Sequence, residues 1–137
     1  MRLVIDANIL VAALLKDATT REILLTENIE FFAPESLSIE IEHLLKNPAI
    51  RKRIKLADKD LFDLTSAVFS RIIFFPEKGF KPFIKQAIPL VTHIEDAPYI
   101  ALSLALKVPL WTNDSALREQ AFVKIYGTSE ILELLAK

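Results

Sequence analysis

Apolar residues along the chain gather in short runs that are rich in β-branched and aromatic side chains. Such runs, without regular polar alternation, are typical of strands buried on both faces of a sheet. The predicted strands are 2–5, 29–33, 72–75, 109–112 and 123–126. Between them, longer mixed segments predict helices at 8–16, 19–28, 34–47, 49–56, 58–71, 80–90 and 95–107, with further helices beginning near 113 and 128.

Cap and turn residues set the expected helix boundaries. The spacing from Thr19 to Glu22 is that of a capping box, Pro34 suits the start of a helix, and Asp58 is the expected cap of the next. The prolines at 82 and 89 make the 80–90 segment only weakly helical. Strands that alternate with helices predict a parallel sheet with helices on both faces.

Composition narrows the class of protein. The 137 residues, 52% of them hydrophobic, suit one domain spanning 1–137, and the absence of cysteine excludes disulfides and thiolate chemistry. Only two glycines occur, which excludes a Gly-rich phosphate loop. The N-terminal apolar run contains Asp6 and Asn8 and is too short to span a membrane. We therefore expect a cytoplasmic protein without membrane contact.

Two segments share one pattern, in which an apolar strand is followed by an aspartate close to an asparagine. They are "LVIDANIL", with Asp6, and "PLWTNDSAL", with Asp114. The carboxyl ends of parallel strands meet at one edge of a sheet, where ligands bind in open α/β folds. Both aspartates are therefore candidates for a shared site, although each could instead simply cap the helix that follows it.

Two further acids are candidates on helices. In "LSIEIEHLL", Glu40 and Glu42 lie on opposite shoulders of the apolar stripe, so helical spacing alone does not decide between them. Asp96 precedes Pro98 at the start of an apolar helix, where the helix dipole also favours a negative charge. The adjacent Glu95 is expected to face solvent.

Four motifs in order resemble those of PIN-domain proteins, over nearly the whole chain. They are "LVIDANIL", "FFAPESLSIEIEHLL", "EDAPYIALSLAL" and "PLWTNDSAL". The resemblance implies a three-layer α/β/α sandwich with a five-stranded parallel sheet. It also implies a ribonuclease that cleaves RNA phosphodiesters, and the chain is similar in size to VapC-type toxins, which pair with an antitoxin protein.

The same resemblance implies a metal site formed by Asp6, Glu40, Asp96 and Asp114, with Glu40 preferred to Glu42 because an apolar residue follows it. Oxygen ligands of this kind suit Mg²⁺ or Mn²⁺, which activate water for phosphodiester cleavage. Asn8, and either Thr112 or Asn113, are expected to orient the carboxylates. Ala116 stands where many family members have another acid, so the sequence leaves open whether one metal or two would bind.

RNA requires cations outside an acidic site. With a net charge of −1, they must come from a local patch, and the basic segment 46–59 is the best candidate. The expected RNA contacts are Arg51, Lys52, Arg53 and Lys55, although a solvated helix face would have the same pattern. His43 lies opposite the apolar stripe of its helix and is expected to be exposed, and neither histidine is needed for the metal chemistry.

Other assignments remain open at this stage. A homodimer is expected from the resemblance and from the large apolar residues in 61–84. A catalytically silent PIN scaffold that binds RNA or a protein partner is the alternative function. An aspartyl-phosphate enzyme or receiver also places acids after its first strand, but "DAN" lacks the second acid that these proteins need.

Overall fold

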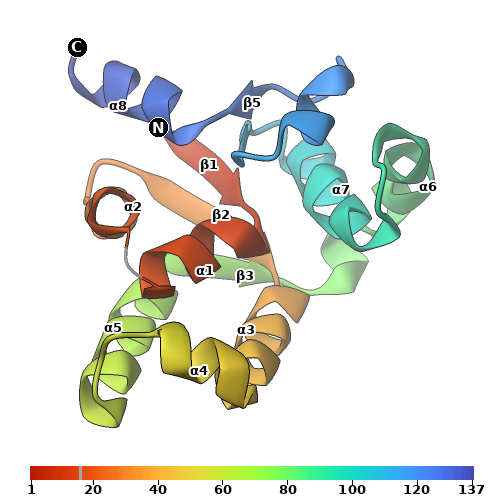
Figure 1. The fold of residues 1–137 in the computed structure, drawn as a ribbon. Helices are drawn as coiled ribbons and strands as arrows, with labels where there is room; N and C mark the ends of the chain where they lie inside the picture. Colours follow the sequence, from red (N-terminus) through yellow and green to blue (C-terminus); the bar gives the residue numbers. More distant parts are fainter. Residues whose placement is uncertain (16) are drawn as a thin grey trace.

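The computed structural model describes residues 1–15 and 17–137 and contains a five-stranded sheet in which every pairing is parallel (Figure 1). The order across the sheet is β3-β2-β1-β4-β5, so the first strand lies at the centre. The strands are β1 Arg2–Ile5, β2 Glu30–Pro34, β3 Ile72–Phe75, β4 Leu110–Trp111 and β5 Ile125–Tyr126. All five predicted strands are therefore confirmed, the last two being shorter than expected.

The central strand explains the apolar pattern of its sequence. Val4 of β1 lies opposite Phe32 of β2 on one side and Leu110 of β4 on the other. Leu3, Val4 and Ile5 have no exposed surface. Alternate residues of a strand face opposite sides of the sheet, so both faces of β1 must be covered.

Helices provide that cover. Helix α1 packs with α2, α3 and α5, whereas α7 packs against β1, β2 and β4. Figure 1 shows α1 to α5 gathered at one side of the molecule and α6 and α7 at the other, which confirms the α/β fold class. Among the described residues, none of the helices is both long and apolar enough to cross a bilayer. The helices are α1 Ala7–Leu15, α2 Ala18–Leu24, α3 Ser36–Lys46, α4 Pro48–Arg53, α5 Asp58–Ser70, α6 Ile84–Ala87, α7 Ala97–Leu106 and α8 Thr128–Leu135.

Several predicted helix boundaries are wrong. The cap of α2 is Asp17, whose carboxylate accepts the N–H of Thr20 at 3.1 Å, so the predicted capping box from Thr19 does not begin this helix. Helix α2 also ends at Leu24 rather than near 28. Asp58 lies in the first turn of α5 after the cap residue Ala57. The predicted end of the first helix, at residue 16, lies outside the described residues.

Short 3₁₀ turns replace helix in three regions. Two turns, Lys81–Phe83 and Ile88–Leu90, flank the single-turn α6 where Pro82 and Pro89 interrupt the chain. The turn η4, Ile94–Asp96, precedes α7, which begins at Ala97 rather than at 95. The segment after β4 forms the 3₁₀ turn η5, Ser115–Glu119, instead of an α-helix. Both η4 and η5 carry acids to the candidate site. One further turn is Glu77–Gly79.

Candidate functional site

An acidic cleft lies where the chain leaves β1 and β4. These strands are neighbours in the sheet, so the residues that follow them are brought to the same edge. All four predicted acids line this cleft of about 360 Å³. Its lining residues are Asp6, Ala7, Asn8, Glu40, His93, Glu95, Asp96, Tyr99 and Asp114.

Asp6 is both a helix cap and a member of the cleft. Its Oδ1 accepts the backbone N–H of Ile9 at 3.1 Å, and the side chain is only 5% exposed. The pKa of Asp6 is raised from 3.8 to about 6. Burial is the largest cause and the charges of Asp96 and Asp114 add to it, while hydrogen bonds from the Thr112 hydroxyl and the Ile9 N–H lower the pKa. The capping and site interpretations of Asp6 are therefore compatible.

Asp114, like Asp6, is both a cap and a member of the cleft. As the cap of η5, its Oδ1 accepts the N–H of Ala116 at 3.0 Å. The N–H of Asp114 donates to Oγ1 of Thr112 at 3.1 Å, and Thr112 is fully buried beside Asp6. A single threonine thus contacts the residues that follow both strands. Of the two alternatives predicted for this positioning role, Thr112 and Asn113, these contacts favour Thr112.

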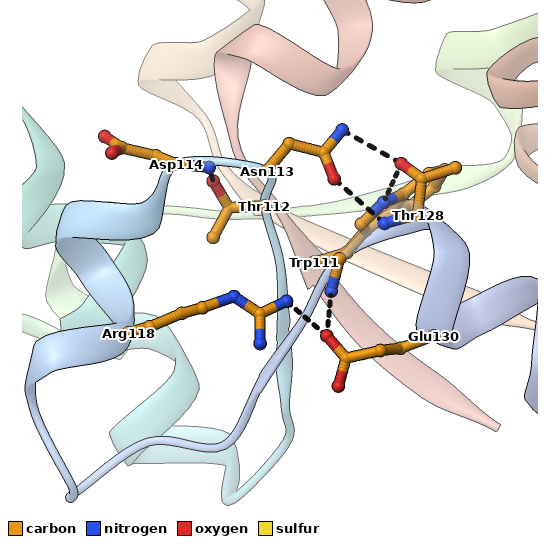
Figure 2. A network of polar contacts seen from close by, with 8 residues as sticks. Trp111, Thr112, Asn113, Asp114, Arg118, Thr128 and Glu130 are labelled. Carbon is orange, nitrogen blue, oxygen red and sulfur yellow. Dashed lines mark hydrogen bonds and ion pairs between the residues drawn. The ribbon is translucent and has the colours of Figure 1, made fainter.

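Asn113 does not orient the carboxylates, contrary to the alternative prediction. Its side chain turns away from Asp114 to the first residue of α8 (Figure 2): Oδ1 accepts the N–H of Thr128 at 2.9 Å, and Nδ2 donates to the Thr128 hydroxyl at 3.0 Å. The amide of Asn113 satisfies a free donor at the helix N-terminus, which a carboxylate contact would leave unpaired. Asn8 lines the cleft but is exposed, and no contact among the described residues joins its side chain to a carboxylate.

The same junction joins α8 to the sheet. The indole N–H of Trp111, which is fully buried, donates to the Thr128 hydroxyl at 3.1 Å. Arg118 of η5 pairs with Glu130, and Glu130 also accepts the N–H of Gly127 at 3.0 Å (Figure 2). These contacts fix the chain on both sides of the Asp114 position.

Thr128→Val is expected to lower the free energy of unfolding by about 1–3 kcal/mol, because it keeps the shape but leaves the buried Trp111 N–H without an acceptor. Chemical denaturation measures the change. Thr19→Val, at an exposed position in α2, is the matched control and should have a much smaller effect. Equal effects of the two substitutions would show that the hydroxyl of Thr128 contributes nothing specific.

Glu40, and not Glu42, faces the cleft. Tyr99 of α7 is 2% exposed, and its hydroxyl donates to Oε1 of Glu40 at 3.2 Å. Burial raises the pKa of Glu40, with additions from Asp96 and Glu95, while the bond from Tyr99 lowers it. Burial and the adjacent Glu40 raise the pKa of Tyr99, so this phenol stays protonated and remains a donor. Glu42 instead lines a separate groove between α3 and α5.

Asp96 reaches the cleft from η4. Burial raises the pKa of Asp96, with further contributions from the charges of Asp114 and Glu95, and the charge of His93 opposes them. Sequence reasoning missed three polar residues of the cleft: His93, Glu95 and Tyr99. Glu95 is exposed as expected, but it also lines the cleft. Tyr99 could have been found from its position three residues after Asp96, which places it near the same face of one helical turn.

The donor set of the cleft fits a hard divalent cation. Its carboxylates are crowded enough to raise one another's pKa, and a bound cation would relieve that repulsion. Carboxylate oxygens are the preferred ligands of Mg²⁺ and Mn²⁺. As the side chains stand, no three His, Asp or Glu residues within 1–15 and 17–137 form a group that could hold an ion. Coordination by three carboxylates would therefore require side-chain movement.

The basic segment lies around α4, and none of its residues lines the cleft. Lys52, Arg53 and Lys55 are exposed, as RNA contacts must be. Arg51 differs: its Nη2 lies 2.6 Å from Oδ1 of Asp58, and its guanidinium also donates to two backbone carbonyls that follow α4. These bonds give Arg51 a structural role in joining α4 to α5. His43 is exposed, as predicted.

The comparison with known families agrees with this fold. A family model described as the PIN domain matches residues 4–135, which include all four acids. The chain therefore belongs to the PIN domain family. PIN domains are generally nucleases, which use divalent metals. No curated protein matches the chain.

Proposed function

We propose that this protein is a metal-dependent ribonuclease that uses the acidic cleft to cleave RNA phosphodiesters. The observation that carries the proposal is the convergence of Asp6, Glu40, Asp96 and Asp114, from four separate segments, on one cleft of a PIN domain. Purely structural caps would not need to gather in this way. The burial of Asp6 beside other carboxylates costs stability, and a cation bound among them would offset that cost.

The residues of the cleft divide into two roles in this proposal. Asp6 and Asp114 would be direct ligands of Mg²⁺ or Mn²⁺, and Glu40 and Asp96 would bind the ion directly or through water. When bound, such an ion supplies an activated water and stabilises charge on the phosphate. Thr112 and the buried Tyr99 hold the carboxylates in position, since each contacts one of the acids or its backbone.

Titration with Mn²⁺ followed by calorimetry separates this proposal from its alternative. A ribonuclease of this kind binds at least one ion in the cleft, and Asp114→Asn should weaken the binding. A catalytically silent scaffold, which binds RNA or a protein without metal, predicts no heat of binding. The absence of any Mn²⁺ binding would therefore reject the ribonuclease.

The exposed basic residues of α4 and the segment after it would hold the RNA backbone. Substitution of Lys52, Arg53 and Lys55 together by alanine is expected to weaken binding to single-stranded RNA of any sequence. The slope of log K against log salt should become shallower by about 0.7 for each phosphate that the variant no longer neutralises. Fluorescence anisotropy at several salt concentrations measures both quantities.

A charge-preserving variant, with Lys52→Arg, Arg53→Lys and Lys55→Arg, is the matched control and should bind nearly as the wild type does. Arg51 is left unchanged because its removal would break bonds within the protein. An alanine variant with the affinity and salt slope of the wild type would mean that the segment is only a solvated face.

Three finer assignments are part of the same proposal. A toxin role with an antitoxin partner is supported by the PIN fold and by the size of the chain. A homodimer is supported by the two most exposed apolar side chains of 61–84, Phe62 and Ile73, while most other large apolar residues of this segment pack in the core. The proposed location is the cytoplasm.

A further inference from the structure

The charge of the acidic cleft raises the question of how it accepts a polyanion. Five carboxylates line it, including Glu95 in addition to the four predicted acids. Of the described residues in the lining, His93 is the only one that can carry a positive charge. Any phosphodiester that enters the cleft therefore meets repulsion from every charged protein group except this imidazole.

The position of His93 is fixed by the turn that carries Asp96. Its backbone is extended, with φ −116° and ψ 128°, and its carbonyl accepts the N–H of Asp96 at 3.0 Å. The residue is exposed, so a ligand can reach its imidazole without displacing the core. Burial and the neighbouring carboxylates raise the pKa of Asp96, and a positive charge on His93 would oppose that rise, which places the imidazole within electrostatic reach of this carboxyl.

We propose that His93 contacts the substrate directly, donating an imidazole N–H to a non-bridging oxygen of the RNA phosphodiester. The inference rests on the proposed function, because it takes RNA as the ligand. An imidazole has an N–H donor in its neutral form as well as in its charged form, so the contact does not depend on protonation. Unlike the carboxylates of the cleft, His93 can supply such a donor.

A role for His93 as a metal ligand is less consistent with the site. Mg²⁺ prefers oxygen ligands, and five carboxylates of the cleft offer them. A merely solvated histidine is the other alternative. The chain contains only two histidines, and His43, exposed on α3, does not line the cleft, so it provides an internal control.

Side-chain NMR of the two histidines tests the contact. The probe is a single-stranded RNA oligonucleotide, added with Ca²⁺ as the divalent ion to slow its cleavage. We expect the imidazole signals of His93 to shift on titration and those of His43 to remain unchanged.

The affinity for the same RNA should fall about tenfold in His93→Ala, which is the scale of one hydrogen bond to a charged group. It should be unchanged in His43→Ala and partly restored in His93→Gln, which keeps an N–H donor.

Mn²⁺ affinity, measured by calorimetry, must be the same in His93→Ala and the wild type. A loss of Mn²⁺ affinity would overturn the proposal, because it would make His93 a metal ligand. Signals of His93 that do not respond to RNA, or wild-type RNA affinity in His93→Ala, would overturn it as well. RNA that binds through His93 but is never cleaved would reject the proposed ribonuclease activity and would leave the proposed His93 contact supported. Cleavage of RNA with the same kcat/KM by the wild type and by His93→Ala would reject the His93 contact and would leave the ribonuclease activity supported.

Discussion

Asp6→Asn is expected to make the metal-free protein more stable near neutral pH. Burial raises the pKa of Asp6 from 3.8 to about 6, so the folded state holds its proton more tightly than the unfolded chain does. The wild type therefore loses stability as the pH rises from about 4 through about 6, and it carries the full cost above that range. Asparagine keeps an oxygen for the Ile9 N–H and removes the charge.

The expected gain from Asp6→Asn is about 1–3 kcal/mol at pH 7.5 in chelator, since one pKa unit corresponds to about 1.4 kcal/mol. At pH values near 3, where Asp6 is protonated, the two proteins should be almost equally stable. Denaturation curves across this pH range measure the difference. Asp17→Asn is the matched control, because Asp17 also caps a helix but lies outside the cleft. A destabilised Asp6→Asn protein at neutral pH would mean that the charge of Asp6 is structurally required.

Mg²⁺ is expected to offset most or all of the stability advantage of Asp6→Asn over the wild type. An ion that binds only the folded state stabilises it by RT ln(1 + [L]/Kd), or about 2.7 kcal/mol at 100 times the dissociation constant. The wild type should therefore show a clear rise in its thermal midpoint with Mg²⁺, whereas Asp6→Asn should show little, and Asp17→Asn should respond as the wild type does. Equal responses of wild type and Asp6→Asn would remove Asp6 from the metal site.

The sheet and the outline of the site follow from local patterns in the sequence. Strand β1 could be identified because its burial on both faces requires a continuous apolar run. Asp6 and Asp114 could be placed together because parallel strands end at a common edge, and β1 and β4 are neighbours in the sheet. Glu40, Glu42 and Asp96 were candidates from their places on the predicted helices, and the resemblance to PIN domains then favoured Glu40 and Asp96.

The remaining features depend on contacts between distant segments. The bond from Tyr99 to Glu40 joins residues 59 positions apart, and nothing in either helix alone indicates it. The amide of Asn113 could have faced Asp114 or α8, and only the packing of α8 decides between them. The charge pattern of α4 likewise did not show that Arg51 pairs with Asp58 while its basic neighbours stay exposed.

Short-range competition explains the errors in the helix boundaries. Asp17 and Thr19 are both good caps, and the choice between them depends on which residue the chain from α1 brings into position. After β4, Asp114 caps a 3₁₀ turn rather than an α-helix. The 3₁₀ turn at Ile94–Asp96 brings His93 and Glu95 to the cleft, where an α-helix beginning at 95 was predicted.

Cleavage of single-stranded RNA by the wild type and by Asp6→Asn, each in Mg²⁺ and in excess chelator, tests the central claim most directly. The account predicts cleavage by the wild type in Mg²⁺ alone, and none by the folded Asp6→Asn protein in either condition. Cleavage that persists in chelator, or that proceeds at the wild-type rate in Asp6→Asn, would contradict the assignment of the acidic cleft as a metal-dependent ribonuclease site.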